Sequence, residues 1–469
     1  MSFDLPGYGS FKTTLVVGAA RSGIAAAALV ASKGGEVLVA DSRAASDLPE
    51  SKKKLEAMSR VQTHFGGHPP ELADRADLVV VSPGVPLSHP LFARARERSV
   101  PVIAEVELAG KFLEARTVGI TGSNGKSTTT ALIAEIARAA GLRSEPAGNF
   151  GRPLSELVGT GVEFAAIELS SFQLEGVRDF RTDAAALLNV TPDHMDRYAS
   201  FDQYAAAKAR IFGAQHPGDA AVLNADDPRC SSVKTNGRRY EFSRTREVSS
   251  GAFVRNGVLI WRDGRSGGDE VVASVGHVRI SGPHNLENAL AAVALARSLG
   301  LPAAAVTEAI ENFPGLPHRS EPVGEIRGMI FVNDSKGTNV DATLKSLESF
   351  LDRKVWLILG GRDKGGDFKP IGERLASSSS SGNSHAVLTV GEAAKRVRND
   401  VQSSVVVIDC GTIEKAVDTA LEGGKSGDAV LLSPACASFD QFRNFEHRGD
   451  EFRRIVRERM NTLTDRGED

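Results

Sequence analysis

A short glycine-rich loop, Gly119-Ile-Thr-Gly-Ser-Asn-Gly-Lys-Ser-Thr128, places the strongest constraint on the fold of this chain. The apolar run RTVGIT leads into the loop and predicts a strand, and the stretch from Ser127 to Ala140 carries apolar residues at helical spacing. A strand, a tight turn and a helix in this order bind phosphate, because the N–H groups at the helix N-terminus point into the loop. The loop therefore predicts a parallel α/β sheet that binds a nucleotide at its carboxyl edge.

The loop also predicts individual contacts. Lys126 is expected to contact the β- and γ-phosphates, and the hydroxyl of Ser127 is expected to bind Mg²⁺. The strict G-x-x-x-x-G-K-[ST] pattern is not met, because Ile120 stands where its first glycine would be. An ordinary strand–turn–helix that contains one lysine is the alternative. The residues expected to bind ATP here are Gly122, Ser123, Asn124, Gly125, Lys126, Ser127 and Thr128.

Length and composition indicate a folded protein of about three domains. The chain has 469 residues, of which 41% are hydrophobic and 25% charged, and a net charge of −3 without long basic blocks. This balance disfavours binding to nucleic acid or to an anionic membrane surface. The three cysteines lack CxxC spacing, which disfavours a disulfide framework or a zinc site. No signal peptide or membrane-spanning run is recognisable, so we expect a cytoplasmic protein.

Apolar strand-like runs alternate with helical segments along the whole chain, which predicts parallel sheets with right-handed crossovers. We expect three α/β domains at residues 1–104, 105–314 and 315–469. Residues 237–281 differ, because their Asn-Gly and Gly-rich turns predict antiparallel strands in a small side sheet. Residues 312–319, rich in Pro and Gly, are the expected linker, and the serine tract at 377–381 is expected to form a loop.

Two polar clusters follow buried strands of the expected central domain. Glu168 ends the run FAAIE, where a carboxylate could bind a second Mg²⁺, although it could also be a solvated strand end. The segment Asn189–Tyr198 contains His194, a candidate metal ligand that Asp193 or Asp196 could orient. A structural histidine is the alternative reading.

The motifs TGSNGKST, ELSSFQLE and NVTPDHMDRY resemble the Mur ligase family, and the last two resemble its D-glutamate-adding branch. The resemblance covers essentially the whole chain. It implies a Rossmann-like N-terminal domain for a UDP-linked substrate, a central P-loop ATPase domain and a Rossmann-like C-terminal domain for an amino acid.

The resemblance assigns further roles in the nucleotide and metal sites. It implies that Glu168 and His194 help to bind the second of two Mg²⁺ ions, and that Lys208 is carbamylated. From the residues alone, Lys208 would be a solvated helix lysine. The ATP contacts that the resemblance adds are Asn285, Asn288, His318, Arg319 and Asp334, with Lys336 facing the acyl phosphate. Asn285 and Asn288 could equally be a helix cap and a first-turn residue.

The first domain begins with Gly18-Ala-Ala-Arg-Ser-Gly23 and has Asp41 at the end of its next strand. This pattern is similar to a dinucleotide fingerprint, but Ala20 replaces its second glycine, which disfavours a nicotinamide cofactor. The helix N-terminus could still bind one diphosphate. The resemblance implies that the UDP-linked substrate is bound by Ser22, Asp41, Ser42, Arg43, Ser82, Pro83, Gly84 and Asn149.

Three polar clusters at strand ends in the last domain could enclose a small dicarboxylic amino acid. For D-glutamate the resemblance nominates Thr338, Lys364, Ser438 and Phe445. Cys436 lies in the last cluster, but no basic partner is evident, so we interpret it as a packing residue.

The resemblance implies that ATP phosphorylates UDP-N-acetylmuramoyl-L-alanine and that the amine of D-glutamate displaces phosphate, in the synthesis of peptidoglycan precursors. Such an enzyme is expected to be a monomer whose domains close over the substrates. Sister branches that add L-alanine, a diamino acid or a dipeptide, or that extend folates, are the nearest alternatives. A nicotinamide dehydrogenase and a non-catalytic nucleotide-binding regulator are more distant ones.

Overall fold

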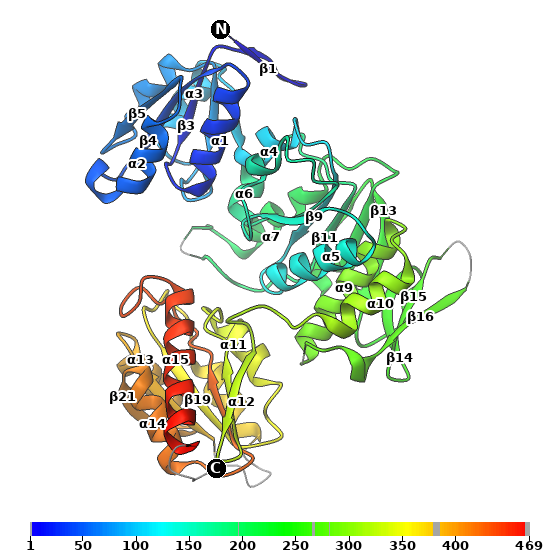
Figure 1. The fold of residues 1–469 in the computed structure, drawn as a ribbon, viewed down its shortest axis with the longest axis vertical. Helices are drawn as coiled ribbons and strands as arrows, with labels where there is room; N and C mark the ends of the chain where they lie inside the picture. Colours follow the sequence, from blue (N-terminus) through cyan, green and yellow to red (C-terminus); the bar gives the residue numbers. More distant parts are fainter. Residues whose placement is uncertain (1, 196, 265–267, 281, 379–384, 465–469) are drawn as a thin grey trace. The chain divides into compact units, whose positions relative to one another are not determined.

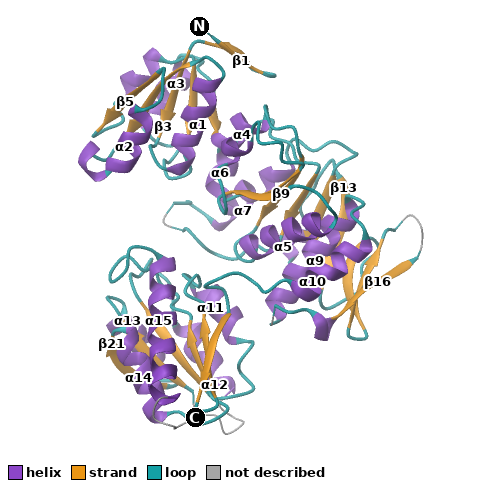
Figure 2. Ribbon diagram, viewed as in Figure 1, coloured by secondary structure: helices purple, strands orange, loops and turns teal. Residues whose placement is uncertain are grey.

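The computed structural model describes residues 2–195, 197–264, 268–280, 282–378 and 385–464. They form two compact units, of which the first comprises residues 1–278 and 287–313 and the second 279–286 and 314–469. The first unit contains two large sheets and the second contains one (Figure 1). The strands of each sheet lie between helices, as the alternating sequence predicts (Figure 2). The domain boundaries at 104 and 314 stay predictions.

A five-stranded sheet forms the N-terminal part of the first unit, in the order β5-β4-β3-β6-β7, and all its neighbours are parallel. Its strands are β3 (Thr13–Val17), β4 (Glu36–Asp41), β5 (Val61–Phe65), β6 (Leu78–Val81) and β7 (Val102–Ala104). The helices are α1 (Arg21–Ser32), α2 (Pro49–Glu56), α3 (Pro90–Glu97) and α4 (Glu105–Gly110), preceded by a hairpin of β1 (Phe3–Leu5) and β2 (Gly9–Phe11). The central strands are buried on both faces, which explains their continuous apolar runs.

The second sheet has nine strands in the order β16-β15-β14-β13-β12-β11-β8-β10-β9. Their bounds are β8 (Arg116–Thr121), β9 (Ser144–Gly148), β10 (Phe164–Glu168), β11 (Ala184–Leu187), β12 (Ala220–Asn224), β13 (Arg238–Ser243), β14 (Gly251–Arg255), β15 (Val258–Arg262) and β16 (Asp269–Ser274). Its helices are α5 (Lys126–Ala139), α6 (Ser171–Glu175), α7 (Phe201–Ala209), α8 (Pro228–Ser231), α9 (Pro283–Ser298) and α10 (Ala303–Asn312).

Antiparallel strands are present at 237–281, as expected of a small side sheet, but the structure differs from the expectation in two details. The strands continue the central sheet, and β13 pairs in parallel with both β12 and β14. Antiparallel pairing is found at β14-β15, which the Asn256-Gly257 turn joins, and at β15-β16. The physical reason is that the backbone N–H and C=O groups of β13 find hydrogen-bond partners on β12, a strand that precedes it by more than ten residues. A short local turn joins only antiparallel strands, so the sequence pattern did not indicate this pairing.

The second unit contains a six-stranded sheet in the order β17-β18-β22-β19-β20-β21. Its strands are β17 (Glu321–Ile326), β18 (Met329–Asn333), β19 (Val355–Gly360), β20 (Ala386–Val390), β21 (Val406–Gly411) and β22 (Ala429–Leu432), and only β17 is antiparallel to its neighbour. The helices are α11 (Val340–Leu347), α12 (Lys369–Ser378), α13 (Ala394–Val401), α14 (Ile413–Gly423) and α15 (Phe445–Thr464). One apolar core joins the sheet to α14 and α15, and another joins it to α11–α13. The loop predicted at 377–381 lies largely outside the described residues, since 379–384 are not among them.

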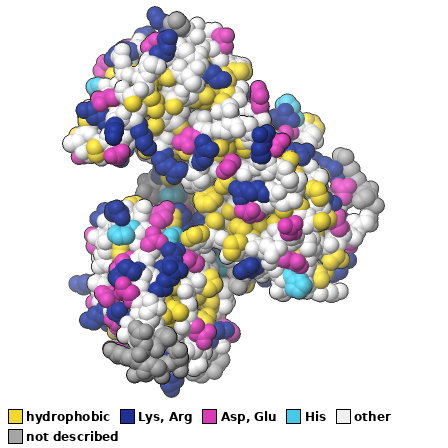
Figure 3. All heavy atoms as spheres, viewed as in Figure 1, with side chains coloured by type: hydrophobic (Ala, Val, Ile, Leu, Met, Phe, Trp, Pro, Cys, Tyr) yellow, Lys and Arg dark blue, Asp and Glu magenta, His cyan; other side chains and the backbone are white. Residues whose placement is uncertain are grey.

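Charged side chains of both signs are interspersed over the face of the molecule drawn in Figure 3. In the described part of the chain, no helix combines the length and the apolar character that crossing a membrane requires.

Candidate active site

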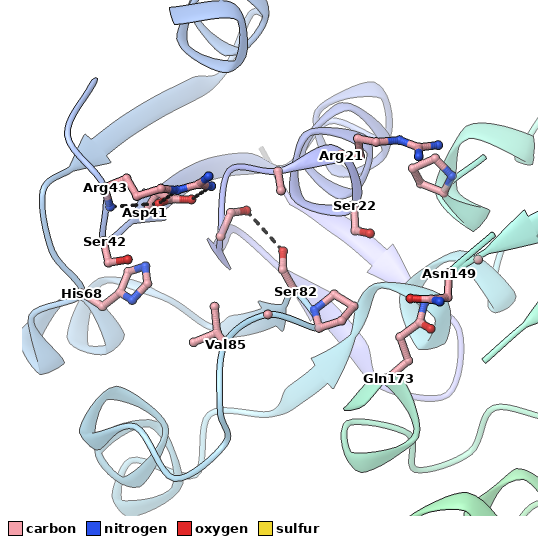
Figure 4. A pocket seen from close by; sticks show the side chains of 16 residues that line it. Arg21, Ser22, Asp41, Ser42, Arg43, His68, Ser82, Val85, Asn149 and Gln173 are labelled. Atoms are coloured by element: carbon pink, nitrogen blue, oxygen red, sulfur yellow. Dashed lines mark hydrogen bonds and ion pairs between the residues drawn. The ribbon is translucent and has the colours of Figure 1, made fainter. Parts of the chain in front are cut away.

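A cavity of about 440 Å³ lies at the carboxyl edge of the N-terminal sheet (Figure 4). It forms there because β3, β4 and β6 are parallel neighbours, so the residues that follow them meet at one edge. The sequence-predicted substrate residues all line it, namely Ser22, Asp41, Ser42, Arg43, Ser82, Pro83, Gly84 and Asn149. The structure thus brings together residues that are up to 127 positions apart in sequence, since Ser22 lies in α1 and Asn149 directly follows β9 of the central sheet.

Asp41 organises this cavity. Its carboxylate accepts hydrogen bonds from the backbone N–H of Ala19 at 2.8 Å and of Arg43 at 3.0 Å, and the Arg43 guanidinium donates two more at 3.0 Å. Burial raises the pKa of Asp41, but these hydrogen bonds and the charge of Arg43 outweigh burial and lower it to about 2. Asp41 is therefore an anion at neutral pH. Ser82 Oγ donates to the Gly18 carbonyl at 3.3 Å, which fixes the opposite wall.

Eight further residues line the cavity without having been named as substrate contacts: Gly18, Ala20, Arg21, His68, Val85, Gly148, Pro153 and Gln173. His68 follows β5, a strand whose partly polar run VQTHF lacks the apolar signal of its neighbours. Had β5 been predicted as a strand of this sheet, the polar residues that follow it, such as His68, would have been candidates for the cavity. Gln173 lies in the quoted motif ELSSFQLE, but nothing in the motif says which side of the helix faces the cavity.

The phosphate loop occupies the carboxyl edge of the central sheet. Gly122 has a φ of 158° and Gly125 a φ of 83°, and the latter caps α5, where a left-handed conformation favours glycine. Ser123 and Asn124 are held by the loop after β11. Ser123 N donates to Asn189 O at 2.9 Å, and Asn124 N donates to Asn189 Oδ1 at 2.8 Å. The loop is thus a fixed turn between β8 and α5.

Two lysines converge on this turn. Lys126 Nζ donates to the carbonyls of Gly122 at 2.8 Å and Ser123 at 2.7 Å, and Lys208 Nζ donates to Gly122 O at 2.7 Å. Lys208 is 1% exposed, in contrast to the solvated lysine that its helix position alone would suggest. Burial, followed by the charge of Lys126, lowers the pKa of Lys208 well below its usual value, although nearby Asp193 and Glu168 act in the opposite direction.

Glu168 ends β10 next to β8 and is 2% exposed. Its Oε2 accepts a hydrogen bond from Ser127 Oγ at 2.5 Å, and its Oε1 accepts one from Asn149 Nδ2 at 2.6 Å. Glu168 therefore connects the phosphate loop to a residue that lines the cavity at the N-terminal sheet. The solvated strand end considered above is excluded for this carboxylate, because it is buried and each of its oxygens accepts a hydrogen bond.

No three His, Cys, Asp or Glu side chains among the described residues cluster closely enough to hold a metal ion. The oxygens of Ser127 and Glu168 nevertheless suit Mg²⁺, which in nucleotide sites takes one or two protein ligands and completes its shell with phosphates and water. The side chain of His194 is 38% exposed, lies 3.6 Å from Asp193 (Nε2 to Oδ2) and packs on Phe172 with ring centroids 4.8 Å apart. Its role in metal binding stays a prediction.

Other predicted nucleotide contacts divide between the two units. Asn288 accepts a hydrogen bond from Thr129 Oγ1 at 3.4 Å, beside the phosphate loop. The second unit contains Asn285, His318, Arg319, Asp334 and Lys336. Of these, His318 has a φ of 63° and its Nδ1 lies 3.0 Å from Asn333 Nδ2, in a network that also contains Glu321.

Asp334 is a buried carboxyl at the end of β18. It accepts hydrogen bonds from Ser433 Oγ at 2.7 Å and Ser320 N at 3.2 Å. Burial raises its pKa to about 6, because these hydrogen bonds only partly offset the loss of water. Lys336 lies close by in sequence, with its Nζ 3.8 Å from the centre of the Phe445 ring.

The predicted amino-acid residues follow strands β18, β19 and β22, which are adjacent in the sheet. Ser438 is buried, Thr338 and Phe445 are half-buried, and Lys364 is exposed. Sequence analysis missed the buried Arg448, which donates to Ser335 Oγ at 3.0 Å, Ser335 O at 2.7 Å and Cys436 O at 3.1 Å and so joins two of the loops. Cys436 is buried and burial raises its pKa to about 12, in keeping with a packing role.

Comparison with known proteins identifies the family. The N-terminal model of MurD-like Mur ligases matches residues 12–104, the Mur ligase middle domain matches 120–296, and the Mur ligase glutamate ligase domain matches 318–436. The UDP-N-acetylmuramoylalanine–D-glutamate ligase of Acidobacterium capsulatum is 42% identical over 95% of this chain and 96% of its own length. The ligase of the same name from Anaeromyxobacter dehalogenans is 45% identical over 94% and 97%.

Solved structures support the same fold at low sequence identity. A pseudomurein peptide ligase of Methanothermus fervidus superposes with a TM-score of 0.60 at 19% identity, covering 95% of this chain and 99% of that one. The UDP-N-acetylmuramate–alanine ligase of Thermotoga maritima gives 0.57 at 18% identity, covering 96% and 99%. These likenesses concern the fold alone, whereas the family models and full-length relatives also match in sequence. The chain belongs to the Mur ligase family.

Proposed function

We propose that the chain joins D-glutamate to UDP-N-acetylmuramoyl-L-alanine and converts ATP to ADP and phosphate, through an acyl-phosphate intermediate in peptidoglycan precursor synthesis. The observation that carries this proposal is the match of nearly the whole chain, at 42% and 45% identity, to ligases named for this reaction. The expectations of a cytoplasmic location and a monomeric state belong to the same proposal.

The substrate cavity suits a UDP-linked ligand. Its floor includes the first turn of α1, where the N–H groups and the helix dipole favour a diphosphate. Arg43 is half-exposed and held flat by Asp41, so its guanidinium can stack on a planar base. Asn149 lies at the other end of the cavity and bonds Glu168, so a ligand that spans the cavity extends toward the phosphate loop.

The phosphate loop supplies the groups that activate the carboxylate of this substrate. Lys126 donates to two carbonyls of its own loop, and we expect it to turn toward the β- and γ-phosphates when ATP binds. Ser127 and Glu168 would hold Mg²⁺, which neutralises charge on the phosphate oxygens during transfer. Phosphorylation turns a poor electrophile into an acyl phosphate, and positioning and electrostatics supply most of the acceleration.

Lys208 is proposed to carry a carbamate. Burial lowers its pKa well below the usual value, which favours the neutral amine, the form that can attack CO₂ as a nucleophile. The product is an anion, which can interact favourably with Lys126 and with a cation at Glu168, whereas an ammonium in this position repels both. Buried carboxylate-like oxygens beside the phosphate loop would also add to the set of oxygens that suits Mg²⁺.

The second unit is proposed to bind D-glutamate. Lys364 would pair with one carboxylate, while Thr338 and Ser438 would donate hydrogen bonds. Arg448 holds two of the loops that carry these residues, through Ser335 and Cys436. The bound amine then attacks the acyl phosphate, and the tetrahedral intermediate expels phosphate.

Phosphate release from ATP tests the proposal. The purified chain is assayed with Mg²⁺, UDP-N-acetylmuramoyl-L-alanine and, in turn, D-glutamate, L-glutamate, L-alanine and a diamino acid. Release that depends on D-glutamate is the expected result. Release with another amino acid would assign the chain to a sister branch, and no release with any of them would refute the proposal. A Lys126→Ala variant serves as the inactive control.

A further inference from the structure

Arg197 joins three parts of the first unit that carry predicted substrate and metal contacts. Its Nη1 donates to the carbonyl of Pro83 at 3.1 Å, and its Nη2 lies 3.1 Å from Glu175 Oε2. The guanidinium carbon Cζ lies over the Phe172 ring, 3.8 Å from its centre. Both side chains of the ion pair are mostly buried, at 17% and 20% exposed, so this arrangement is not an ordinary surface salt bridge.

The three partners come from two elements. Pro83 lies in the loop after β6, in the wall of the substrate cavity. Phe172 and Glu175 belong to α6, whose Gln173 lines the same cavity. Arg197 itself lies in the segment Asn189–Tyr198, which binds the phosphate loop through Asn189. One guanidinium therefore contacts the cavity wall of the N-terminal sheet and the short helix at the edge of the central sheet.

Helix α6 is suited to this role because its position is fixed. Ser170 Oγ accepts a hydrogen bond from Gln173 N at 3.2 Å, and Gln173 Oε1 accepts one from Ser170 N at 3.0 Å, which forms a reciprocal N-terminal cap. Phe172 also packs against His194, and Tyr198 OH bonds Glu175. A movement of Pro83 would therefore be transmitted through Arg197 to the residues around His194.

We propose that Arg197 is a positioning residue that holds the Ser82–Val85 wall of the substrate cavity in register with the phosphate and metal loops. An arginine suits this task, because its planar fork can donate to a carbonyl and a carboxylate at once while one face stacks on an aromatic ring. The inference rests on the proposed function and deepens it. It assigns the alignment of the reacting carboxylate to a residue that need not touch any substrate.

Loss of the Arg197 side chain is expected to affect the binding of the UDP-linked substrate more than the binding of ATP. Without Arg197, Pro83 and Gly84 lose their tie to the central sheet, so the substrate binds to a looser wall and its reacting carboxylate is less well aligned. Misplacement of a reacting group by about 1 Å can cost about a hundredfold in rate. The phosphate loop keeps its own bonds to Asn189, so ATP binding is not expected to change.

The test compares Arg197→Ala, Arg197→Lys and a matched control, Arg210→Ala. Arg210 also bonds α6, through its Nε to Leu174 O at 2.8 Å and its Nη2 to Val177 O, but these bonds do not reach the substrate cavity. For each protein, kcat and the KM values for the UDP-linked substrate, ATP and D-glutamate are measured by phosphate release. Thermal melting checks that each variant is folded.

For Arg197→Ala we expect the KM of the UDP-linked substrate to rise about tenfold and kcat to fall about tenfold or more, with the other two KM values within about twofold of wild type. Arg197→Lys keeps the charge but not the planar fork, so it should recover only part of the loss. Arg210→Ala should leave the ratio of the KM values unchanged.

Wild-type kinetics in both Arg197 variants would overturn the proposal, as would an equal effect of Arg210→Ala, because a general weakening of α6 would then suffice. If Arg197→Ala does not fold, Arg197→Lys alone decides, since full activity in that variant contradicts the need for the fork. An inactive wild-type protein would instead refute the proposed function, so the two failures are distinguishable.

Discussion

Replacement of Asp41 by asparagine should loosen the substrate cavity by an amount that the structure allows to be estimated. The asparagine keeps one carbonyl oxygen for the N–H of Ala19 but loses the charge that pairs with Arg43. Asp41 is nearly buried, at 4% exposed, so the loss is not replaced by water at the same position. Ala19 and Ser22 lie at the start of α1, where the diphosphate is proposed to bind.

The pKa of Asp41 supplies the magnitude. It lies at about 2 in the folded chain, against an ordinary value of 3.8. The difference of about 1.8 units corresponds to about 2.4 kcal/mol, and because Arg43 is half-exposed, solvent screening reduces this to about 1–2 kcal/mol. The folded-state pKa is depressed, so this stabilisation is present above about pH 4 and is lost as the pH falls through about 2.

Hydrogen exchange read by mass spectrometry is the suitable assay, because it reports local stability and does not require two-state unfolding of a multidomain chain. Peptides that cover Gly18–Arg43 are followed in wild type and Asp41→Asn. At about pH 7 exchange in the variant should be faster by about five- to thirtyfold, the equivalent of about 1–2 kcal/mol. At about pH 3 roughly half of the difference should remain, since the unfolded carboxyl is then mostly protonated.

The control is Asp74→Asn, which removes an exposed carboxylate that pairs with Arg94 at 3.0 Å on the same domain. An exposed ion pair contributes little, so exchange in the Gly18–Arg43 peptides should not change. If the Asp41→Asn peptides exchange at the wild-type rate at about pH 7, the carboxylate does not organise the cavity. A difference that grows as the pH falls would contradict the sign of the pKa argument.

Three further outcomes are expected. Protein grown or incubated with ¹³C-bicarbonate should show a carbamate carbon signal by NMR. Lys208→Arg should lack both the signal and activity, because a guanidinium stays protonated and offers no amine that can form the carbamate. Asp334→Asn should raise the melting temperature at neutral pH while lowering kcat, because ionising a buried carboxyl with a pKa of about 6 costs up to about 3 kcal/mol there and nothing below about pH 4. Glu107→Ala should lower the melting temperature by several degrees, because the buried carboxylate accepts hydrogen bonds from the backbone N–H groups of Arg178, Asp179 and Phe180.

Much of the α/β organisation was predictable because parallel strands buried on both faces read as continuous apolar runs. The apolar runs RTVGIT and FAAIE, which form β8 and β10, are examples that this property alone predicts. The same logic placed polar residues at strand ends, and the structure gathers those of β3, β4 and β6 into one cavity. The apolar runs do not predict the order of strands in each sheet, because that order depends on pairings between distant segments.

The order of strands in the sheets explains both why the pairing of β13 was not predicted and why Asn149 and Glu168 lie side by side. The segment at 238–243 looks like one arm of a local hairpin, yet it pairs in parallel with β12 because an open sheet edge is available there. Likewise, the bond between Asn149 and Glu168 arises because β9 and β10 are neighbours, although no spacing in the sequence relates the two residues to one chemistry. Local patterns specify elements, whereas the pairing of elements decides which polar groups meet.

Lys208 and Arg197 show where this limit affects function. A lysine in an alanine-rich helix is ordinarily solvated, and nothing in YAAAKAR indicates that its amine reaches the Gly122 carbonyl and is removed from water. An arginine beside a tyrosine is ordinarily a surface residue, yet here it bonds Pro83, more than a hundred residues away. Both side chains act at contacts between distant segments, and their chemistry follows from burial that only the folded chain imposes. For such residues the resemblance to a family can nominate a role, as it does for Lys208, but the physical reason for the role lies in the packing.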